Sequence, residues 1–196
     1  MAMHNELWFP SVLWSAIRHD IDNSVIKKFA YEYQKRIPEG RVISNYGGWQ
    51  SHDIRPGECA EIDKLVGILN TEVADCAKQV GLKIPMLYNI WININPPGAY
   101  NNLHHHLGSM FSGAYYVDAD PEQGNIQFER NDGAEYHIPV GMIEKTTYYT
   151  ASKATYGAKT GALYIFPGWM KHNVEGNRSN KDRISISFNY GESDAN

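Results

Sequence analysis

Residues 86–95 read Met-Leu-Tyr-Asn-Ile-Trp-Ile-Asn-Ile-Asn, and this stretch decides the fold class. The two kinds of residue alternate along it. Each even position from 88 to 94 is tyrosine or isoleucine, and each odd position from 89 to 95 is asparagine or tryptophan. This period of two is typical of a β-strand whose faces meet different surroundings. Residues 183–190, Arg-Ile-Ser-Ile-Ser-Phe-Asn-Tyr, alternate just as strictly. Both stretches therefore predict strands with one apolar and one more polar face.

Further runs of β-branched and aromatic residues lie between these two stretches, separated by clusters of Pro, Gly, Asn and Asp. They predict strands at residues 112–117, 124–128, 136–139, 146–150 and 162–166. Seven or so short strands with turn residues between them are typical of a closed or double-layered antiparallel β structure.

The part of the chain before residue 86 shows helical rather than strand periodicity, because apolar residues recur there at spacings of three and four. One helix is predicted after the N-capping residues 20–23, and it should end before Pro38. A second helix is predicted from Ile62 to Val80, with Gly81 as the residue that follows its end. Both helices should pack on the outside of the β structure.

Two shorter segments complete the N-terminal region. Residues 7–17 are aromatic and β-branched and predict a short leading strand. Residues 44–51 predict a glycine-containing loop or an edge strand that exposes Trp49. We predict one domain over residues 1–196, with a helical support region at 1–84 and a β core at 85–190.

The composition narrows the range of functions. The 196 residues include 18 Lys+Arg and 22 Asp+Glu, a net charge of −4, without a basic block that would bind nucleic acid or an anionic membrane. No apolar run approaches the length of a membrane span, and the first residues lack the basic start of a signal peptide. The two cysteines cannot form a dense disulfide framework, so a cytoplasmic protein is expected.

Histidine is the unusual residue of the composition. Three of the eight histidines are consecutive, at positions 104–106. Side chains two residues apart on a strand point the same way, so His104 and His106 could share a metal while His105 faces away. His172 is the candidate third ligand, although it lies far along the chain from His104. In a double-stranded β-helix, strands this far apart in sequence become neighbours.

The predicted last strand supplies an anion site. Its polar face carries Arg183 and Ser185, and a guanidinium offers a fork of donors to a carboxylate, with the hydroxyl as a further donor. Aromatic side chains are candidates for the walls of the pocket, namely Trp91, Trp169, Tyr148, Tyr149 and Tyr164.

The motifs together resemble the family of small 2-oxoglutarate- and iron(II)-dependent oxygenases over residues 91–190. They are His104-x-His106, Ser109, Ser112-Gly-Ala-Tyr-Tyr-Val117, Phe166-Pro-x-Trp-x-x-His172, Asn177-Arg-Ser179 and the run 183–189. The resemblance implies a double-stranded β-helix fold of the jelly-roll, cupin-like type. It also implies one Fe(II), 2-oxoglutarate and O2 as cosubstrates, and hydroxylation of an unidentified substrate with release of succinate and CO2.

By position, the resemblance also implies residue roles. His104 and His172 match the two histidines of the superfamily's iron site, and Arg183, assisted by Ser185, matches the residue that pairs with the distal carboxylate of 2-oxoglutarate. Tyr116 stands where prolyl-hydroxylase-like members place a tyrosine that contacts the same carboxylate. Weaker candidates for contact with cosubstrate or substrate are Asn93 and Tyr100.

One position departs from the superfamily pattern, which has Asp or Glu two residues after the first histidine. This chain has His106 there, and a neutral imidazole leaves the iron site one charge unit more positive. Acidic residues nearby in sequence are candidates for an additional ligand, namely Asp118, Asp120 and Glu129.

Two other functions are compatible with the same residues. A three-histidine cupin dioxygenase would use O2 without 2-oxoglutarate, but it has no need of the Arg183-x-Ser185 anchor. A non-catalytic metal-binding barrel would explain the missing carboxylate. The substrate class is open between a small molecule, a peptide and a protein side chain. The aromatic N-terminal strand is a candidate contact for a homodimer.

Overall fold

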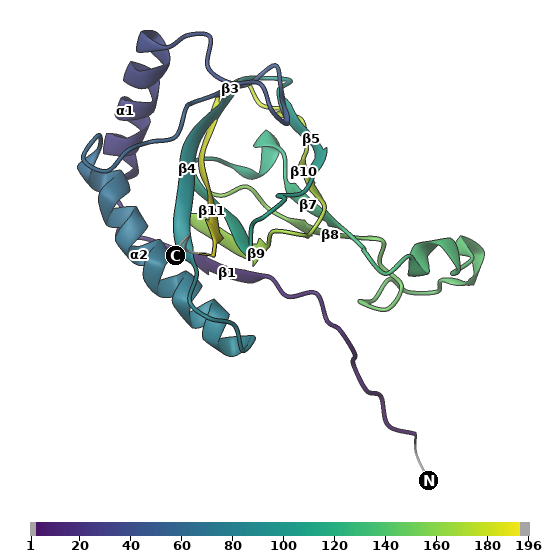
Figure 1. Ribbon diagram of the computed structural model, residues 1–196. Coiled ribbons are helices and arrows are strands. Elements are labelled where there is room, and N and C mark those ends of the chain that lie inside the picture. The colour runs from purple at the N-terminus through teal and green to yellow at the C-terminus, as the bar shows by residue number, and fades with distance from the viewer. Residues whose placement is uncertain (1–2, 193–196) are drawn as a thin grey trace.

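Two antiparallel β-sheets pack against each other, and two helices cover the outer side of the larger sheet (Figure 1). This computed structural model describes residues 3–192. Residues 1–2 and 193–196, the ends of the predicted 1–196 domain, lie outside the described part, and the division of the chain into domains stays a prediction.

The larger sheet has six strands in the order β1-β9-β6-β11-β4-β3. Its strands are β1 (Trp14–Ile17), β3 (Trp49–Gln50), β4 (Met86–Asn95), β6 (Phe111–Asp118), β9 (Ala162–Pro167) and β11 (Arg183–Gly191). The smaller sheet has five strands in the order β2-β5-β10-β7-β8. They are β2 (Asn45–Tyr46), β5 (Tyr100–His104), β7 (Ile126–Glu129), β8 (Lys153–Tyr156) and β10 (His172–Val174).

The alternating stretches at 86–95 and 183–190 form the centre of the larger sheet. β11 lies between β4 and β6 and pairs antiparallel with both, so that Ser185 is the register partner of Asn93 on one side and of Tyr116 on the other. The predicted strands at 112–117, 124–128 and 162–166 correspond to β6, β7 and β9. The prediction of a mainly β fold with N-terminal helices is confirmed.

The helices α1 (Asn23–Arg36) and α2 (Ala60–Gln79) form where the apolar periodicity predicts them. The Asp22 side chain accepts a hydrogen bond from the backbone N–H of Ser24 at the start of α1. In α2, a stripe of buried side chains includes Leu65, Leu69 and Val73. These helices bury their apolar faces against the larger sheet, so the predicted packing outside the β structure is confirmed.

The apolar interior has two parts. The first lies between the helices and the larger sheet and contains, for example, Ile26, Leu69 and Ile186, all fully buried. The second lies between the two sheets and contains Phe128 and Phe166, whose rings stand 4.8 Å apart. Because helices fill one face of the larger sheet, its other face is left to pack on the smaller sheet and to line a cavity.

Two local predictions for the N-terminal region were wrong. Trp49 is buried rather than exposed, since its indole packs against Tyr33 and donates Nε1–H to the Ile37 carbonyl at 2.9 Å. Only residues 14–17 of the predicted leading strand 7–17 are a strand, because β9 offers partners to those residues alone.

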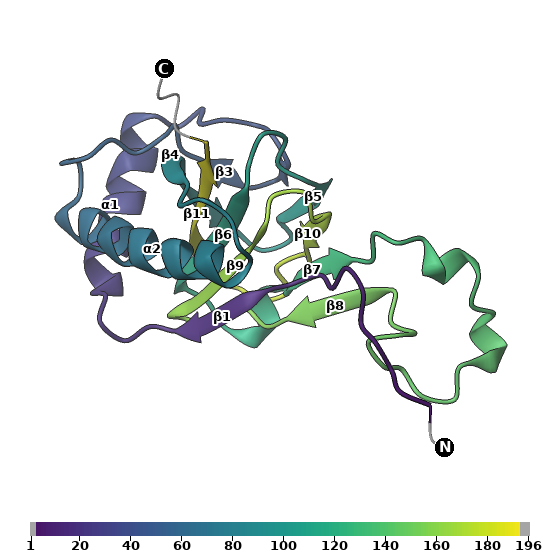
Figure 2. The same cartoon turned by 60° about the horizontal axis from the view of Figure 1, so that its bottom comes forward.

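The predicted strands at 136–139 and 146–150 are absent. This segment joins β7 to β8 and projects away from both sheets, so it meets no strand with which to pair (Figure 2). It forms the 3-10 turns η2 (Ala134–Tyr136) and η3 (Val140–Met142) instead, and Tyr136 is 85% exposed. A third short turn, η1 (Pro121–Gln123), precedes β7. Among residues 3–192, neither helix is long and apolar enough to cross a bilayer.

Candidate functional site

Pairing of β5 with β10 brings two of the predicted histidines together. His104 is the last residue of β5, His172 is the first of β10, and the two are direct register partners. Their ring centroids lie 4.3 Å apart. The long separation in sequence is thus closed by one antiparallel strand pair, as the sequence predicts.

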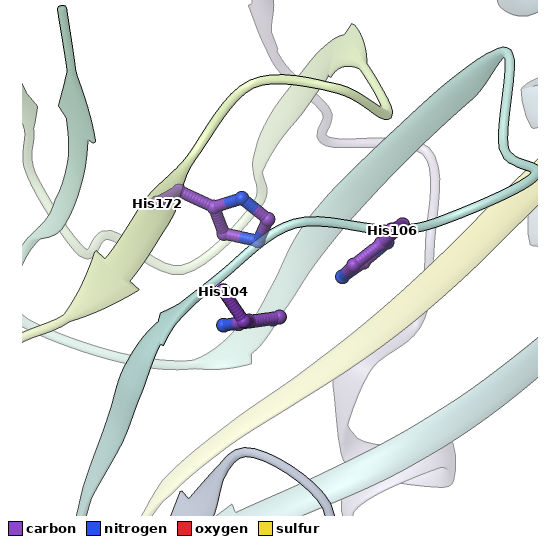
Figure 3. A group of neighbouring side chains, drawn as sticks. All are labelled: His104, His106 and His172. Carbon is purple, nitrogen blue, oxygen red and sulfur yellow. The ribbon is translucent and has the colours of Figure 1, made fainter.

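His106 reaches the same point from the turn that follows β5. Its backbone N–H donates to the Gly168 carbonyl at 2.8 Å, and its ring centroid lies 5.1 Å from those of both His104 and His172. The nitrogens that the three rings offer all lie within 4.8 Å of one another (Figure 3). Three converging imidazoles form a donor set that suits Fe, Zn, Cu or Ni. His105 is exposed and is not part of this cluster.

Hydrogen bonds at Nδ1 decide which nitrogen each ring presents. Nδ1–H of His104 donates to the carbonyl of Asn102 at 2.7 Å, and Nδ1–H of His172 donates to the carbonyl of Met170 at 2.8 Å. A carbonyl only accepts, so the proton of each neutral ring lies on Nδ1 and the Nε2 lone pair is free to bind a metal. The residues present fit a transition-metal site.

Burial keeps these rings neutral. Loss of solvent lowers the pKa of His106 to about 4 and that of His172 to about 3, and it lowers the pKa of His104 as well. Mutual repulsion between the imidazolium forms acts in the same direction. At neutral pH the folded chain therefore presents uncharged nitrogen donors without first having to release protons.

The same pKa shifts predict how the metal-free protein responds to acid. Between the folded pKa values of about 3 to 4 and the ordinary value of 6.5, the unfolded chain binds more protons than the folded chain. Stability should therefore fall as the pH decreases through this window, by about 2 kcal/mol for each of His106 and His172 between roughly pH 8 and pH 5. Urea unfolding at a series of pH values measures this dependence.

The variant His172→Gln should remove the share of this residue, about 2 kcal/mol of the decrease. His105→Gln, a change at the exposed residue of the triplet, is the control and should leave most of the dependence in place, because burial is the main cause of the lowered pKa values. A free energy of unfolding that stays constant from pH 8 to pH 5 would contradict the prediction.

An inner cavity of about 50 Å³ opens beside the histidines, between the two sheets. It is lined by all three histidines and by Asn93, Tyr116, Arg183 and Ser185, together with ten further residues of both sheets and the adjoining loops. The predicted metal ligands and the predicted cosubstrate residues therefore share one cavity. Trp91 is also on its wall, whereas the other aromatic candidates are not.

Arg183 is a buried cation without a carboxylate partner among the described residues. Its side chain is 1% exposed, and its Nη1 donates to main-chain carbonyls, those of Gln123, Gly124 and Glu175. Burial raises the pKa of the facing Tyr116 to about 12, so its phenol is protonated and can donate. A desolvated guanidinium beside neutral donors is a site for an anionic group such as the carboxylate of 2-oxoglutarate.

Several sequence candidates lie elsewhere. The acidic side chains proposed as an additional ligand have other partners: Asp118 pairs with Lys27 at 2.5 Å, Glu129 pairs with Lys153 at 3.4 Å, and Asp120 caps η1. Among the described residues, the metal cluster consists of the three histidines alone.

The aromatic wall was largely mispredicted. Trp169 and Tyr148 are 50% and 70% exposed, and Tyr149 lies in the projecting segment beside Tyr148. Tyr164 is buried in the apolar interior, where its hydroxyl donates to the carbonyl of Gly157. The weaker candidate Tyr100 stacks on Tyr46 outside the cavity.

A second, outer cavity of about 440 Å³ adjoins the histidines and falls in the size range of small-molecule sites. It is lined by Arg41, Ile43, Ser44, Gln50, Tyr88, Asn89, Trp91, Asn102, Leu103, His104, His105, His106, Leu107 and Asn189. Sequence reasoning missed most of this set. The alternation of residues 88–95 could have indicated Asn89, whereas nothing in the sequence marks the loop residue Arg41.

Comparison with known protein sequences gives two findings. Residues 89–189, just over half of the chain, match a family model described as "Putative 2OG-Fe(II) oxygenase". No curated protein sequence matches the chain.

Solved structures with a similar fold include a prolyl-4-hydroxylase from Pseudomonas putida, with a TM-score of 0.64 and 15% identity over 93% of this chain and 94% of that one. The non-haem, α-ketoglutarate-dependent carbocyclase SnoK from nogalamycin biosynthesis has a TM-score of 0.68 and 13% identity, over 94% and 81%. HygX from Streptomyces hygroscopicus, with nickel and 2-oxoglutarate bound, has a TM-score of 0.61 and 11% identity, over 94% and 84%. At these identities the similarity shows the fold, and the predicted double-stranded β-helix is confirmed.

Proposed function

Because the chain belongs to the family of 2-oxoglutarate- and Fe(II)-dependent oxygenases, we propose that it hydroxylates a substrate and releases succinate and CO2. Family membership also assigns Fe(II) as the cofactor and 2-oxoglutarate and O2 as cosubstrates. One observation carries the proposal: three neutral imidazoles and a buried guanidinium without a carboxylate partner among the described residues line the same cavity.

In this proposal His104, His106 and His172 hold Fe(II) through Nε2, and the metal supplies the activation of O2 that organic side chains lack. The protein's part is to keep all three rings neutral and to shield them from bulk water. Three imidazoles add no negative charge, so the site is more positive than one with a carboxylate ligand. An anionic cosubstrate is correspondingly favoured as a neighbour.

Arg183 binds the distal carboxylate of 2-oxoglutarate in this proposal, with the hydroxyls of Ser185 and Tyr116 as further donors. Asn93 faces the same cavity, and its Nδ2 donates to Ser187 Oγ at 3.0 Å, which fixes the orientation of the amide. These groups come from three adjacent strands of one sheet, so they are held by continuous backbone pairing. The cosubstrate is thereby oriented before the substrate enters.

The substrate binds in the outer cavity in this proposal. Arg41, which pairs with Asp53 at 3.3 Å, is a cation on its wall. The remaining polar lining is amide, hydroxyl, indole and imidazole, and no Asp or Glu is among the lining residues. Such a lining disfavours a cationic substrate and suits a neutral or anionic small molecule or peptide. The net charge of −4 supports a protein that binds neither nucleic acid nor an anionic membrane.

Two further properties complete the proposal. Cys59 and Cys76 are buried and free, which supports a reducing compartment such as the cytoplasm. Leu7, Trp8 and Phe9 are 62%, 73% and 94% exposed at the N-terminal arm, which supports a homodimer contact there.

The proposal is tested by adding Fe(II) and 2-oxoglutarate to the metal-free protein without oxygen, and then admitting O2. We expect a weak visible charge-transfer band in the first step and succinate formation in the second. O2 consumption that is independent of 2-oxoglutarate would indicate the three-histidine cupin dioxygenase instead. Metal binding with neither the band nor O2 consumption would indicate the non-catalytic barrel.

A further inference from the structure

His106 differs from the other two histidines in the partner of its Nδ1. His104 and His172 donate to main-chain carbonyls two residues earlier in the chain, whereas Nδ1 of His106 lies 2.5 Å from the side-chain oxygen Oδ1 of Asn189. Asn189 is near the end of β11, 83 residues further along the chain, and is 6% exposed. The orientation of His106 therefore depends on a side chain from the other sheet.

A second side chain reinforces this contact. Ser112 Oγ lies 2.8 Å from Nδ1 of His106 and donates to Oδ1 of Asn189 at 2.7 Å. Ser112 and Asn189 are register partners on β6 and β11, so continuous sheet pairing holds both. The hydroxyl hydrogen of Ser112 and Nδ1–H of His106 thus converge on one amide oxygen, which is an acceptor with two lone pairs.

The chemistry of the amide oxygen decides the tautomer of His106. Because Oδ1 can only accept, the ring must place its proton on Nδ1 to make this bond, and Nε2 then carries the free lone pair. If the amide were flipped so that its oxygen and nitrogen exchanged places, its N–H group would donate to Nδ1 and Nε2 would carry the proton. A protonated Nε2 cannot bind a metal. The orientation of Asn189 thus selects the donor atom of His106.

The position of His106 explains why it needs such a partner. His104 and His172 belong to paired strands, but His106 lies in the turn beyond β5, where its backbone is held by the bond from its N–H to the Gly168 carbonyl. We propose that Asn189 is a positioning residue that directs Nε2 of His106 toward the metal, an inference that rests on the proposed Fe(II) site. Partners of this kind orient metal-binding histidines and strengthen metal affinity.

The test is a titration of the metal-free protein with Co(II) alone, followed by its ligand-field absorption spectrum. Asn189→Ala should weaken Co(II) binding by about 10- to 100-fold and alter the spectrum, because the ring loses both its tautomer and its orientation. Asn89→Ala is the matched control: Asn89 is the register partner of Asn189 on β4 and lines the same outer cavity, and no hydrogen bond joins it to a histidine among the described residues. It should keep the affinity and the spectrum of the wild type.

A conservative variant separates positioning from packing. Asn189→Asp keeps the size and the acceptor oxygen and adds a negative charge, so it should bind Co(II) at least as tightly as the wild type. Weaker binding by Asn189→Asp, or wild-type affinity and spectrum in Asn189→Ala, would overturn the inference and leave the proposed function intact. A wild-type protein that binds no Co(II) would overturn both.

Discussion

Replacing His172 with alanine is expected to abolish Fe(II) binding and, with it, all succinate formation. The change removes one of three converging nitrogens and leaves two, which is too few for tight binding of a transition metal in a protein site. The loss of affinity should exceed about 100-fold, more than the removal of a hydrogen-bond partner of a ligand costs. Metal content after anaerobic reconstitution and gel filtration measures it directly.

His105 provides the control for this experiment. It lies between two of the candidate ligands in sequence, yet its side chain is exposed on the outside of the turn. His105→Ala should therefore retain one metal per chain. Metal loss in His105→Ala, or retention of metal in His172→Ala, would show that the cluster of Figure 3 is not the metal site.

Replacing Arg183 with glutamine should weaken 2-oxoglutarate binding by at least about 100-fold while leaving Fe(II) binding in place. Hydrogen bonds from a charged donor contribute about 1.5 to 3 kcal/mol each, and a bidentate guanidinium–carboxylate pair makes two of them. Each 1.4 kcal/mol corresponds to about a factor of 10 in the dissociation constant. Anaerobic titration of the Fe(II)-loaded variant with 2-oxoglutarate gives this constant.

Two further measurements complete the Arg183 experiment. Arg183→Lys keeps the charge but loses the planar fork, so its affinity for 2-oxoglutarate should fall between those of the wild type and the glutamine variant. Thermal unfolding should be followed in parallel, because Nη1 of Arg183 also bonds to buried carbonyls that either change disturbs. Unchanged 2-oxoglutarate affinity in the folded glutamine variant would exclude Arg183 as the anchor.

Long strands with strict alternation were predictable from sequence, and short ones were not. β4 and β11 have 10 and 9 residues and bury one face under the helices, so their periodicity is strong. β5 and β10 have 5 and 3 residues and read Tyr-Asn-Asn-Leu-His and His-Asn-Val, which are too short and too polar to show a pattern. Residues 136–139 and 146–150 have strand propensity but form no strand, because a strand also needs a neighbouring strand with which to pair.

The candidate site likewise contains residues that could be predicted from the sequence and one that could not. The chemistry of His104, His106, His172 and Arg183 is visible in the residue types, and their spacing on a β-helix suggested that they converge. The alternation of side chains on a strand predicts that His106 shares the strand of His104, but His106 lies in the turn beyond it. The partner of its ring, Asn189, could not be found from sequence. Asn189 is one of several polar residues on its strand face, and only the path of that turn singles it out.

The direct pairing of His104 with His172 has a consequence for folding. The side chains of β10 alternate between its two faces, so sliding this strand by one residue against β5 would turn the imidazole away from its partner. A metal held by both rings would act as a clip that admits a single strand register and closes the long loop between the two strands. Such a metal would bind only the chain with the correct strand pairing. At a free concentration of about 100 times its dissociation constant, it would add about 2.7 kcal/mol to the free energy of unfolding. The cofactor would then favour the correct strand register during folding in addition to its part in the reaction.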